Sequence, residues 1–114
     1  MSKINLAISG CMGRMGQQLI KSSRSDKDFN LVSLTESRLI NKKFNGIKPE
    51  LNSEDAFKKV EVIIDFTVPK CTFEILKIAS KLKKKVVIGT TGFNKKEEDI
   101  IKKFFEKAKS FWKN

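Results

Sequence analysis

Three glycines spaced three residues apart form the segment of this sequence with the clearest chemical meaning. They lie in Gly10-Cys11-Met12-Gly13-Arg14-Met15-Gly16, between an apolar run and a helical pattern. In a turn from a strand to a helix, such glycines permit a tight turn, close approach of a pyrophosphate to the backbone, and close helix–strand packing. The N–H groups at a helix start favour anions, and Arg14 adds a positive charge. The segment predicts a phosphate-binding turn, with a purely structural glycine turn as the alternative.

Glu36 is the second candidate, because it lies 20 residues past Gly16 at the end of an apolar run. A carboxylate at the end of the second strand can accept hydrogen bonds from the ribose hydroxyls of an adenosine. Its position therefore favours a nucleotide contact over a solvated residue at a strand end.

Two further groups of polar residues follow apolar runs. Gly89, Thr90 and Thr91 come directly after the last run, so they are expected at the carboxyl edge of a parallel sheet, where ligands bind. Glycines permit close backbone approach there, and threonine hydroxyls can meet a ribose or a carboxamide. Thr67 follows the preceding run, and it is either a ligand contact or the N-cap of a helix that begins near Pro69.

Histidine is absent and there are two cysteines, Cys11 and Cys71. The composition excludes histidine-based acid–base catalysis and Ser–His or Cys–His nucleophile pairs, and it leaves no cysteine-rich metal site. We therefore assign no catalytic residue and no metal ligand. Cys11 is expected to be a small residue that fills the turn, rather than a thiol whose pKa is lowered by the helix N-terminus.

The net charge is +11, from 24 Lys and Arg against 13 Asp and Glu. The basic residues are spread along the chain and only three are arginines, so we expect a lysine-rich surface and no nucleic-acid partner. No apolar window of about 18 residues is present, which argues against a membrane span. The start of the chain lacks the features of a signal peptide, so a cytoplasmic location is expected.

Apolar runs alternate with helical periods, which is typical of an α/β fold with a parallel sheet. We predict a Rossmann-like sheet of about four strands with flanking helices. The predicted strands are 4–8, 31–34, 60–66 and 86–88, and residues 37–50 are predicted to be a loop. The predicted helices are 14–23, a short helix at 53–57 capped by Ser53, a helix from Pro69 that carries Phe73, Leu76, Ile78, Ala79 and Leu82, and a last helix capped by Asn94 with an apolar stripe over 100–112.

The run at 86–88 is as apolar as a central strand, yet no later segment could pair with its outer side. A bare apolar edge is a risk of aggregation that complete domains cover or charge. We therefore expect the sheet to be truncated before its remaining strands.

Three motifs of the chain together resemble a known family. Residues 8–16, the segment Asp65-Phe66-Thr67-Val68-Pro69 and the segment Gly89-Thr90-Thr91-Gly92-Phe93 are similar in order and spacing to bacterial dihydrodipicolinate reductases. The similarity extends from about residue 3 to about residue 109. Aspartate-dehydrogenase-like oxidoreductases share part of the pattern.

The resemblance implies an NAD(P)H-dependent reductase of 4-hydroxy-tetrahydrodipicolinate in lysine and diaminopimelate biosynthesis. It places the pyrophosphate on Gly10, Cys11, Met12, Gly13, Arg14 and Met15, the adenosine ribose on Glu36, and the nicotinamide end on Gly89, Thr90 and Thr91. Family members often carry Arg after the ribose-binding acid, whereas this chain has Ser37 there and Arg38 one position further on. The choice between NADH and NADPH therefore stays open, with Arg38, Lys42 or Lys43 available for a 2′-phosphate.

The family also has parts that cannot be mapped on this chain. These are an Asn-x-Ser-x-Gly segment, a substrate domain with a His-His-x-x-Lys proton donor, and a sheet that builds a homotetramer. We thus interpret residues 1–114 as an incomplete dinucleotide-binding domain that lacks the substrate and tetramerisation domain and does not catalyse the reaction alone. The alternatives are a non-enzymatic, regulatory nucleotide-binding module and a basic nucleic-acid-binding protein.

Overall fold

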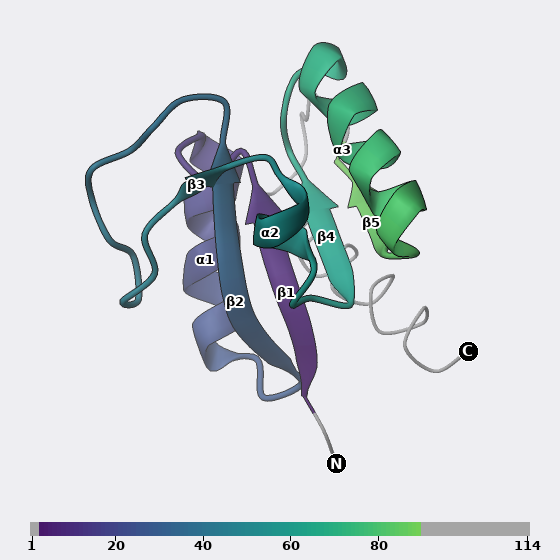
Figure 1. Cartoon of the computed structure of the whole chain (residues 1–114). Helices are drawn as coiled ribbons and strands as arrows, with labels where there is room; N and C mark the ends of the chain where they lie inside the picture. The colour runs from purple at the N-terminus through teal and green to yellow at the C-terminus, as the bar shows by residue number, and fades with distance from the viewer. Residues whose placement is uncertain (1–2, 90–114) are drawn as a thin grey trace.

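The computed structural model describes residues 3–89, and these form a parallel sheet with helices on both faces (Figure 1). The strands are β1 (Ile4–Ser9), β2 (Phe29–Glu36), β3 (Glu50–Leu51), β4 (Val62–Asp65) and β5 (Lys85–Ile88), and the helices are α1 (Arg14–Ser25), α2 (Glu54–Phe57) and α3 (Pro69–Leu82). The predicted α/β class is confirmed. The predicted helix capped by Asn94 and its stripe over 100–112 lie outside the described residues.

The sheet has the order β3-β2-β1-β4-β5, and every pairing between these strands is parallel. The chain runs outward from β1 to β2 and β3, then returns to β4 on the other side of β1. Open α/β sheets bind ligands where the direction of the strand order reverses in this way, outside the carboxyl ends of the strands. The topology therefore points to the segment that follows β1.

The pairing of β1 with β2 contains one irregularity. Leu6 pairs with Leu31 but Ala7 pairs with Ser33, so β2 carries one extra residue at this point. As a result, Leu31 and Leu34 contact the same hydrophobic cluster although they are three residues apart, whereas Val32 packs against the cluster on the opposite face. A regular strand would alternate its faces at every residue.

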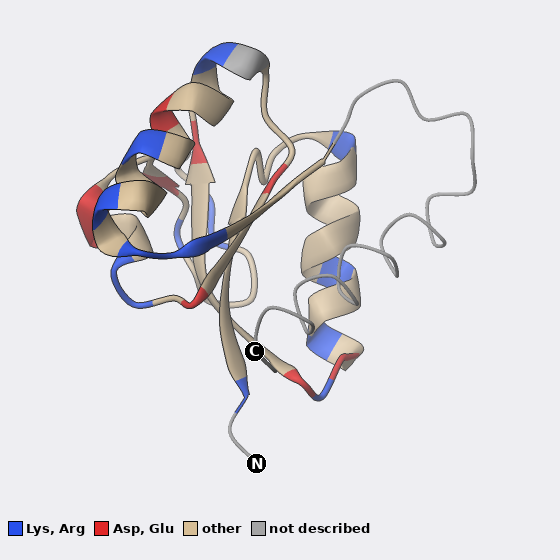
Figure 2. Ribbon diagram, turned by 90° about the vertical axis from the view of Figure 1, so that its right-hand side faces the viewer, with Lys and Arg blue, Asp and Glu red and all other residues tan. Residues whose placement is uncertain are grey.

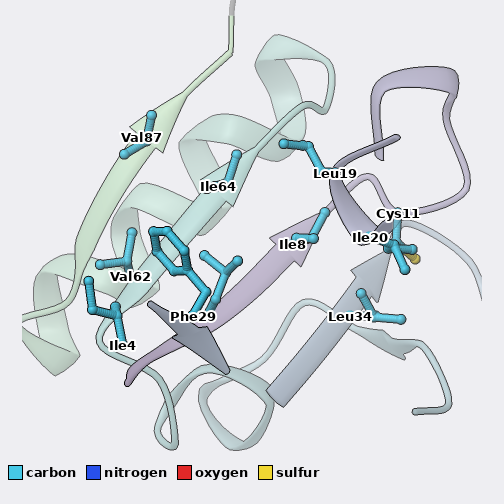
Figure 3. Packing of buried hydrophobic residues seen from close by; sticks show 11 residues of the cluster. Ile4, Ile8, Cys11, Leu19, Ile20, Phe29, Leu34, Val62, Ile64 and Val87 are labelled. Atoms are coloured by element: carbon cyan, nitrogen blue, oxygen red, sulfur yellow. The ribbon is translucent and has the colours of Figure 1, made fainter. Parts of the chain in front are cut away.

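Two hydrophobic clusters hold the layers together. Under α1, Leu19 and Ile20 pack on strand residues that include Ile8, Leu34 and Ile64 (Figure 3). On the other face, Phe57 of α2 and Ile75 and Ala79 of α3 pack on Ala7, Val60 and Ile63. Since β1 and β4 are covered on both faces, their nearly continuous apolar sequences are what a central parallel strand requires.

The structure corrects two details of the sequence interpretation and confirms a third. The sheet has five strands rather than about four, because Glu50 and Leu51 at the end of the predicted loop pair with Thr35 and Glu36. In α3 the fully buried residue is Ile75, whereas Phe73 is 73% exposed and Leu76 36% exposed. The short helix at 54–57 is confirmed, and the side chain of its N-cap Ser53 accepts from the N–H of Ala56 as a capping residue should.

The charged residues show no single basic face among the described residues. Lys and Arg occur on helices on both sides of the sheet and at strand ends, interspersed with acidic residues (Figure 2). Within residues 3–89, no helix combines the length and the apolar composition needed to cross a membrane.

Candidate functional site

The register of the sheet aligns the carboxyl ends of four strands. Ser9 pairs with Thr35 and with Asp65, and Asp65 pairs with Ile88. The residues that follow this row, Gly10, Glu36, Phe66 and Gly89, therefore lie along one edge of the sheet. Four segments that are far apart in the sequence meet there, as the positions of the motifs predicted.

The glycine turn, residues 10–16, is shaped by close contacts between backbone atoms. Gly10 has a φ of +80°, a conformation that side chains other than glycine rarely adopt. A Cβ on Gly16 would overlap the carbonyl oxygen of Gly10 and lie 2.7 Å from the Cα of Cys11. Gly13 is different, because a Cβ there would meet only the carbonyl oxygen of Gly10 at 3.4 Å. The outer two glycines are thus required by the fold, while Gly13 leaves open space in front of the helix.

The first amides of the turn are satisfied within the protein. Gly10 and Cys11 donate their N–H groups to the carbonyl of Thr35 at 3.0 and 3.2 Å, and Gly13 donates to the carbonyl of Gly10 at 3.1 Å. The next helical turn differs, since α1 begins at Arg14 and its N-cap Gly13 makes no side-chain capping bond. The first N–H groups of a helix have no partner within the helix, and together with its dipole they attract an anion. The first turn of α1 is therefore the part of this segment that is best suited to an anion.

Glu36 reaches the glycine turn directly. Its Oε2 accepts the N–H of Met12 at 3.0 Å, and its Oε1 accepts the N–H of Ser37 at 2.9 Å. The side chain is half-buried, so the carboxylate is bonded to backbone and is also accessible from outside. The structure thus brings together the two features that the sequence placed 20 residues apart.

Cys11 is fully buried in the cluster under α1. Burial raises the pKa of its thiol to about 11, and the negative charge of Glu36 adds to this effect. A thiol with such a pKa is protonated and unreactive at neutral pH. The prediction that Cys11 fills the turn, rather than acting as a thiol of lowered pKa, is confirmed.

The threonine turn, residues 66–68, follows β4 and is organised by the carboxylate of Asp65. This carboxylate is completely buried. Its Oδ1 accepts the N–H of Thr67 at 2.9 Å and the hydroxyl of Thr67 at 2.5 Å, and its Oδ2 accepts the hydroxyl of Thr72 at 2.6 Å. The N-cap of α3 is Val68, whose side chain makes no capping bond, so the interpretation of Thr67 as the N-cap is wrong.

Phe66 links the threonine turn to both glycine segments. A Cβ on Gly10 would lie 2.6 Å from the carbonyl oxygen of Phe66 and 3.3 Å from the methyl group of Thr67. A Cβ on Gly89 would lie 2.5 Å from the ring of Phe66. Gly89 also donates its N–H to the carbonyl of Asp65 at 2.7 Å. The glycines at both positions therefore let the chain close around residues 66 and 67.

Four predicted site residues remain, namely Arg14, Arg38, Thr90 and Thr91. Arg14 and Arg38 are exposed, the first at the start of α1 and the second in the loop after β2. Thr90 and Thr91 lie outside the described residues. Sequence reasoning did not single out Asp65 or Thr72 as site residues, although an acidic residue at the end of an almost wholly apolar strand was a usable signal. Among residues 3–89, no cluster of cysteine, aspartate and glutamate side chains could hold a metal ion.

Comparison with known sequences places the chain. The sequence model described as "Dihydrodipicolinate reductase, N-terminus" matches residues 4–114. The chain belongs to this family. It is 71% identical over 104 residues to the 4-hydroxy-tetrahydrodipicolinate reductase of Pelagibacter ubique, an alignment that covers 91% of this chain and 40% of that protein. It is 40% identical over 118 residues to the reductase of the same name from Buchnera aphidicola, with 92% and 43% covered. The chain thus spans well under half the length of these dihydrodipicolinate reductases.

Solved structures show the same fold. A dihydrodipicolinate reductase from Paenisporosarcina with dipicolinate bound superposes with a TM-score of 0.68 at 24% identity, covering 90% of this chain and 43% of that one. A protein named RSP, solved in complex with β-NADH, superposes with a TM-score of 0.67 at 14% identity, covering 97% and 63%. The relatives give no support to the alternative of a non-enzymatic, regulatory nucleotide-binding module.

Proposed function

We propose that this chain is the dinucleotide-binding part of an NAD(P)H-dependent 4-hydroxy-tetrahydrodipicolinate reductase of lysine and diaminopimelate biosynthesis. One observation carries the proposal: the carboxylate of Glu36 accepts the N–H of Met12 beside a helix whose N-cap, Gly13, has no side chain to cap it. An acceptor for ribose hydroxyls beside a helix N-terminus is the pair of contacts that an adenine dinucleotide needs, and it supports the proposal.

Different residues of the chain then bind different parts of the cofactor. The pyrophosphate lies against the segment Gly10 to Met15, with the N–H groups at the start of α1 as its donors and Gly13 leaving room for it. The adenosine ribose hydroxyls donate to Glu36. The nicotinamide end lies toward Thr67 and Gly89, on the β4 and β5 side, and Thr90 and Thr91 are further proposed contacts. When bound, the nicotinamide supplies the hydride that reduces the substrate.

We propose that Arg38 is the residue that meets the 2′-phosphate of NADPH. It is exposed and follows Glu36 by two residues. Lys42 is less suited, because its Nζ lies over the ring of Phe44, 5.2 Å from the centroid. Arg38→Ala should therefore weaken NADPH more than NADH.

The chemical step requires groups that residues 1–114 do not supply. The proton donor and the dicarboxylate-binding residues belong, in our proposal, to a separate substrate domain, and the assembly surface of a homotetramer lies there too. Residues 1–114 act as the cofactor-binding domain in the cytoplasm, with a small-molecule cofactor and neither a nucleic acid nor a membrane as partner.

Titration of the 114-residue chain with NADH and NADPH, followed by the chemical shifts of its amide groups, tests the proposal. We expect saturable shifts in the glycine turn and in residues 36–38, and weaker binding in Gly13→Ala, where a methyl group occupies the space for the pyrophosphate. Glu61→Gln is the control, because this side chain accepts the N–H of Asn5 at the opposite edge of the sheet. Absence of binding to both nucleotides at millimolar concentration would contradict the proposal.

A further inference from the structure

Asp65 is a buried carboxylate at the edge of the proposed cofactor site that no step so far has used. Its side chain is 0% exposed and accepts three hydrogen bonds, from the N–H and hydroxyl of Thr67 and from the hydroxyl of Thr72. Hydrogen bonds to a carboxylate are stronger than those between neutral groups. The two hydroxyl protons are therefore held on the Asp65 oxygens.

This arrangement fixes what Thr67 can offer to a ligand. A threonine hydroxyl has one proton and two lone pairs. The Thr67 proton points to Asp65 at 2.5 Å, in preference to the carbonyl of Val68 at 3.3 Å. The Thr72 proton is also on Asp65, so the contact of 3.3 Å between the two hydroxyl oxygens has no proton to share. The oxygen of Thr67 is left as an acceptor.

We propose that Asp65 is a positioning residue that makes Thr67 an acceptor, so that the cofactor group facing Thr67 is a hydrogen-bond donor. In a nicotinamide dinucleotide this group is a hydroxyl of the nicotinamide ribose or the N–H of the carboxamide, and not a phosphate oxygen. The inference rests on the proposed function, and it adds the polarity of one contact and the part of the cofactor that makes it.

The location of Thr67 supports the nicotinamide half. Thr67 lies after β4, on the side of β1 that leads to β5 and Gly89, whereas Glu36 lies after β2 on the other side. The buried negative charge behind Thr67 also opposes a phosphate at this point. The methyl group of Thr67 faces the glycine turn, 3.3 Å from the position of a Cβ on Gly10. Thr67 therefore lies next to the glycine turn, on its β4 side.

The experiment compares NADH with ADP, which contains the adenosine and pyrophosphate but lacks the nicotinamide half. Both affinities are measured by amide chemical shifts, which reach millimolar dissociation constants. In Thr67→Val we expect the NADH affinity to fall about threefold to tenfold, the effect of one hydrogen bond, and the ADP affinity to change less than about twofold. Thr67→Ser, which keeps the hydroxyl, should restore NADH binding.

Asp65→Ala is the second arm, because it removes the acceptor of the Thr67 hydroxyl proton and lets that hydroxyl rotate. It should lower NADH affinity and leave ADP affinity unchanged, while Glu61→Gln changes neither. Thr72→Val removes a hydroxyl from the same carboxylate, so it measures the structural cost alone by its effect on the melting temperature.

Three results overturn the inference in distinguishable ways. Equal loss of NADH and ADP in Thr67→Val would place Thr67 at the pyrophosphate. Unchanged NADH affinity in Thr67→Val, with wild-type binding intact, would show that Thr67 makes no contact. Failure of the wild-type chain to bind NADH and NADPH would overturn the proposed function and the inference with it.

Discussion

The strands on either side of β1 both end in an acidic residue, and the two carboxylates are used in opposite ways. Glu36 at the end of β2 is half-buried and accepts backbone N–H groups of Met12 and Ser37. Asp65 at the end of β4 is fully buried and accepts two side-chain hydroxyls besides one N–H. The same chemical group thus organises a glycine turn on one side and a threonine turn on the other.

The difference shows how each turn depends on its residues. The glycine turn is held by backbone contacts that a single Cβ would disrupt, so its sensitive positions are glycines, and Glu36 is free to serve a ligand. The threonine turn is held by side-chain bonds to a buried charge, so its sensitive position is Asp65. A carboxylate near a ligand site can therefore act on the ligand itself or on the residue that meets it, and its burial distinguishes the two roles.

The largest effect is expected at Gly16. In Gly16→Ala the Cβ overlaps the carbonyl of Gly10, which is backbone and cannot move away cheaply, so the free energy of unfolding should fall by about 3 kcal/mol. Urea denaturation measures this loss. Gly13→Ala is the matched control, because its φ of −72° suits alanine, and its stability should change by less than about 1 kcal/mol, since the smaller loss of chain entropy and the poorer N-cap preference of alanine oppose each other. Equal losses in both variants would contradict the assignment of separate roles to these glycines.

On the other side, Asp65→Ala is expected to have the second-largest effect. It leaves the N–H of Thr67 and two hydroxyls without their acceptor, and we expect a loss of about 2 kcal/mol in the free energy of unfolding. Glu61→Ala, which removes an acceptor of one N–H at the far edge, should cost less. A loss in Asp65→Ala no greater than that in Glu61→Ala would show that the carboxylate does not organise the threonine turn.

The buried thiol of the glycine turn predicts a dependence of stability on pH. The pKa of Cys11 is raised from 9.0 to about 11 in the folded chain. Its contribution is fully present below pH 9, and it is lost as the pH rises toward 11, because the unfolded chain releases the proton first. We expect the free energy of unfolding to fall by at most about 2 kcal/mol more in the wild type than in Cys11→Ala over this range. Parallel pH curves for the two proteins would contradict this result.

The smallest effect links the thiol to Glu36. Because the charge of Glu36 helps to raise the pKa of Cys11, Glu36→Gln should lower that pKa toward its ordinary value while burial keeps it above 9.0. The ultraviolet absorbance of the thiolate during a pH titration reports this shift, with Cys71→Ala as the background to remove the second thiol. The stability cost at neutral pH should be less than about 1 kcal/mol, since one amide oxygen can still accept the N–H of Met12. An unchanged pKa of Cys11 in Glu36→Gln would show that the charge of Glu36 does not act on this thiol.

Most of the fold could be predicted from the sequence, because the strands β1, β4 and β5 are short apolar runs between glycine or polar punctuation. β3 could not be predicted, since a pair of exposed residues at a sheet edge has no hydrophobic pattern to mark it. The buried side of α3 could not be predicted from the sequence either. Phe73 and Leu76 are apolar yet exposed, and only the packing of the folded chain shows that Ile75 is the buried residue.

The candidate site shows a similar division. The sequence predicted that the glycine turn and Glu36 belong to one nucleotide site, because their spacing follows from the strand–helix–strand geometry, and the structure adds the direct bond between them. The roles of Asp65 and Thr72 depend on which hydroxyl rotates toward a buried carboxylate, and spacing contains no such information. The participation of Thr90 and Thr91 remains a prediction.

The extra residue in β2 has a consequence for which side chain can reach the glycine turn. Phe29 and Leu31 face α1, so a strictly alternating strand would turn Thr35 to that face and Glu36 away from it. The register shift between Leu31 and Ser33 exchanges these two positions. Insertion of one further residue in β2 after the shift would point the carboxylate away from the turn, whereas loss of Val32 would restore regular pairing and leave Glu36 in place. The direction of the Glu36 side chain therefore depends on the number of residues that precede it in β2.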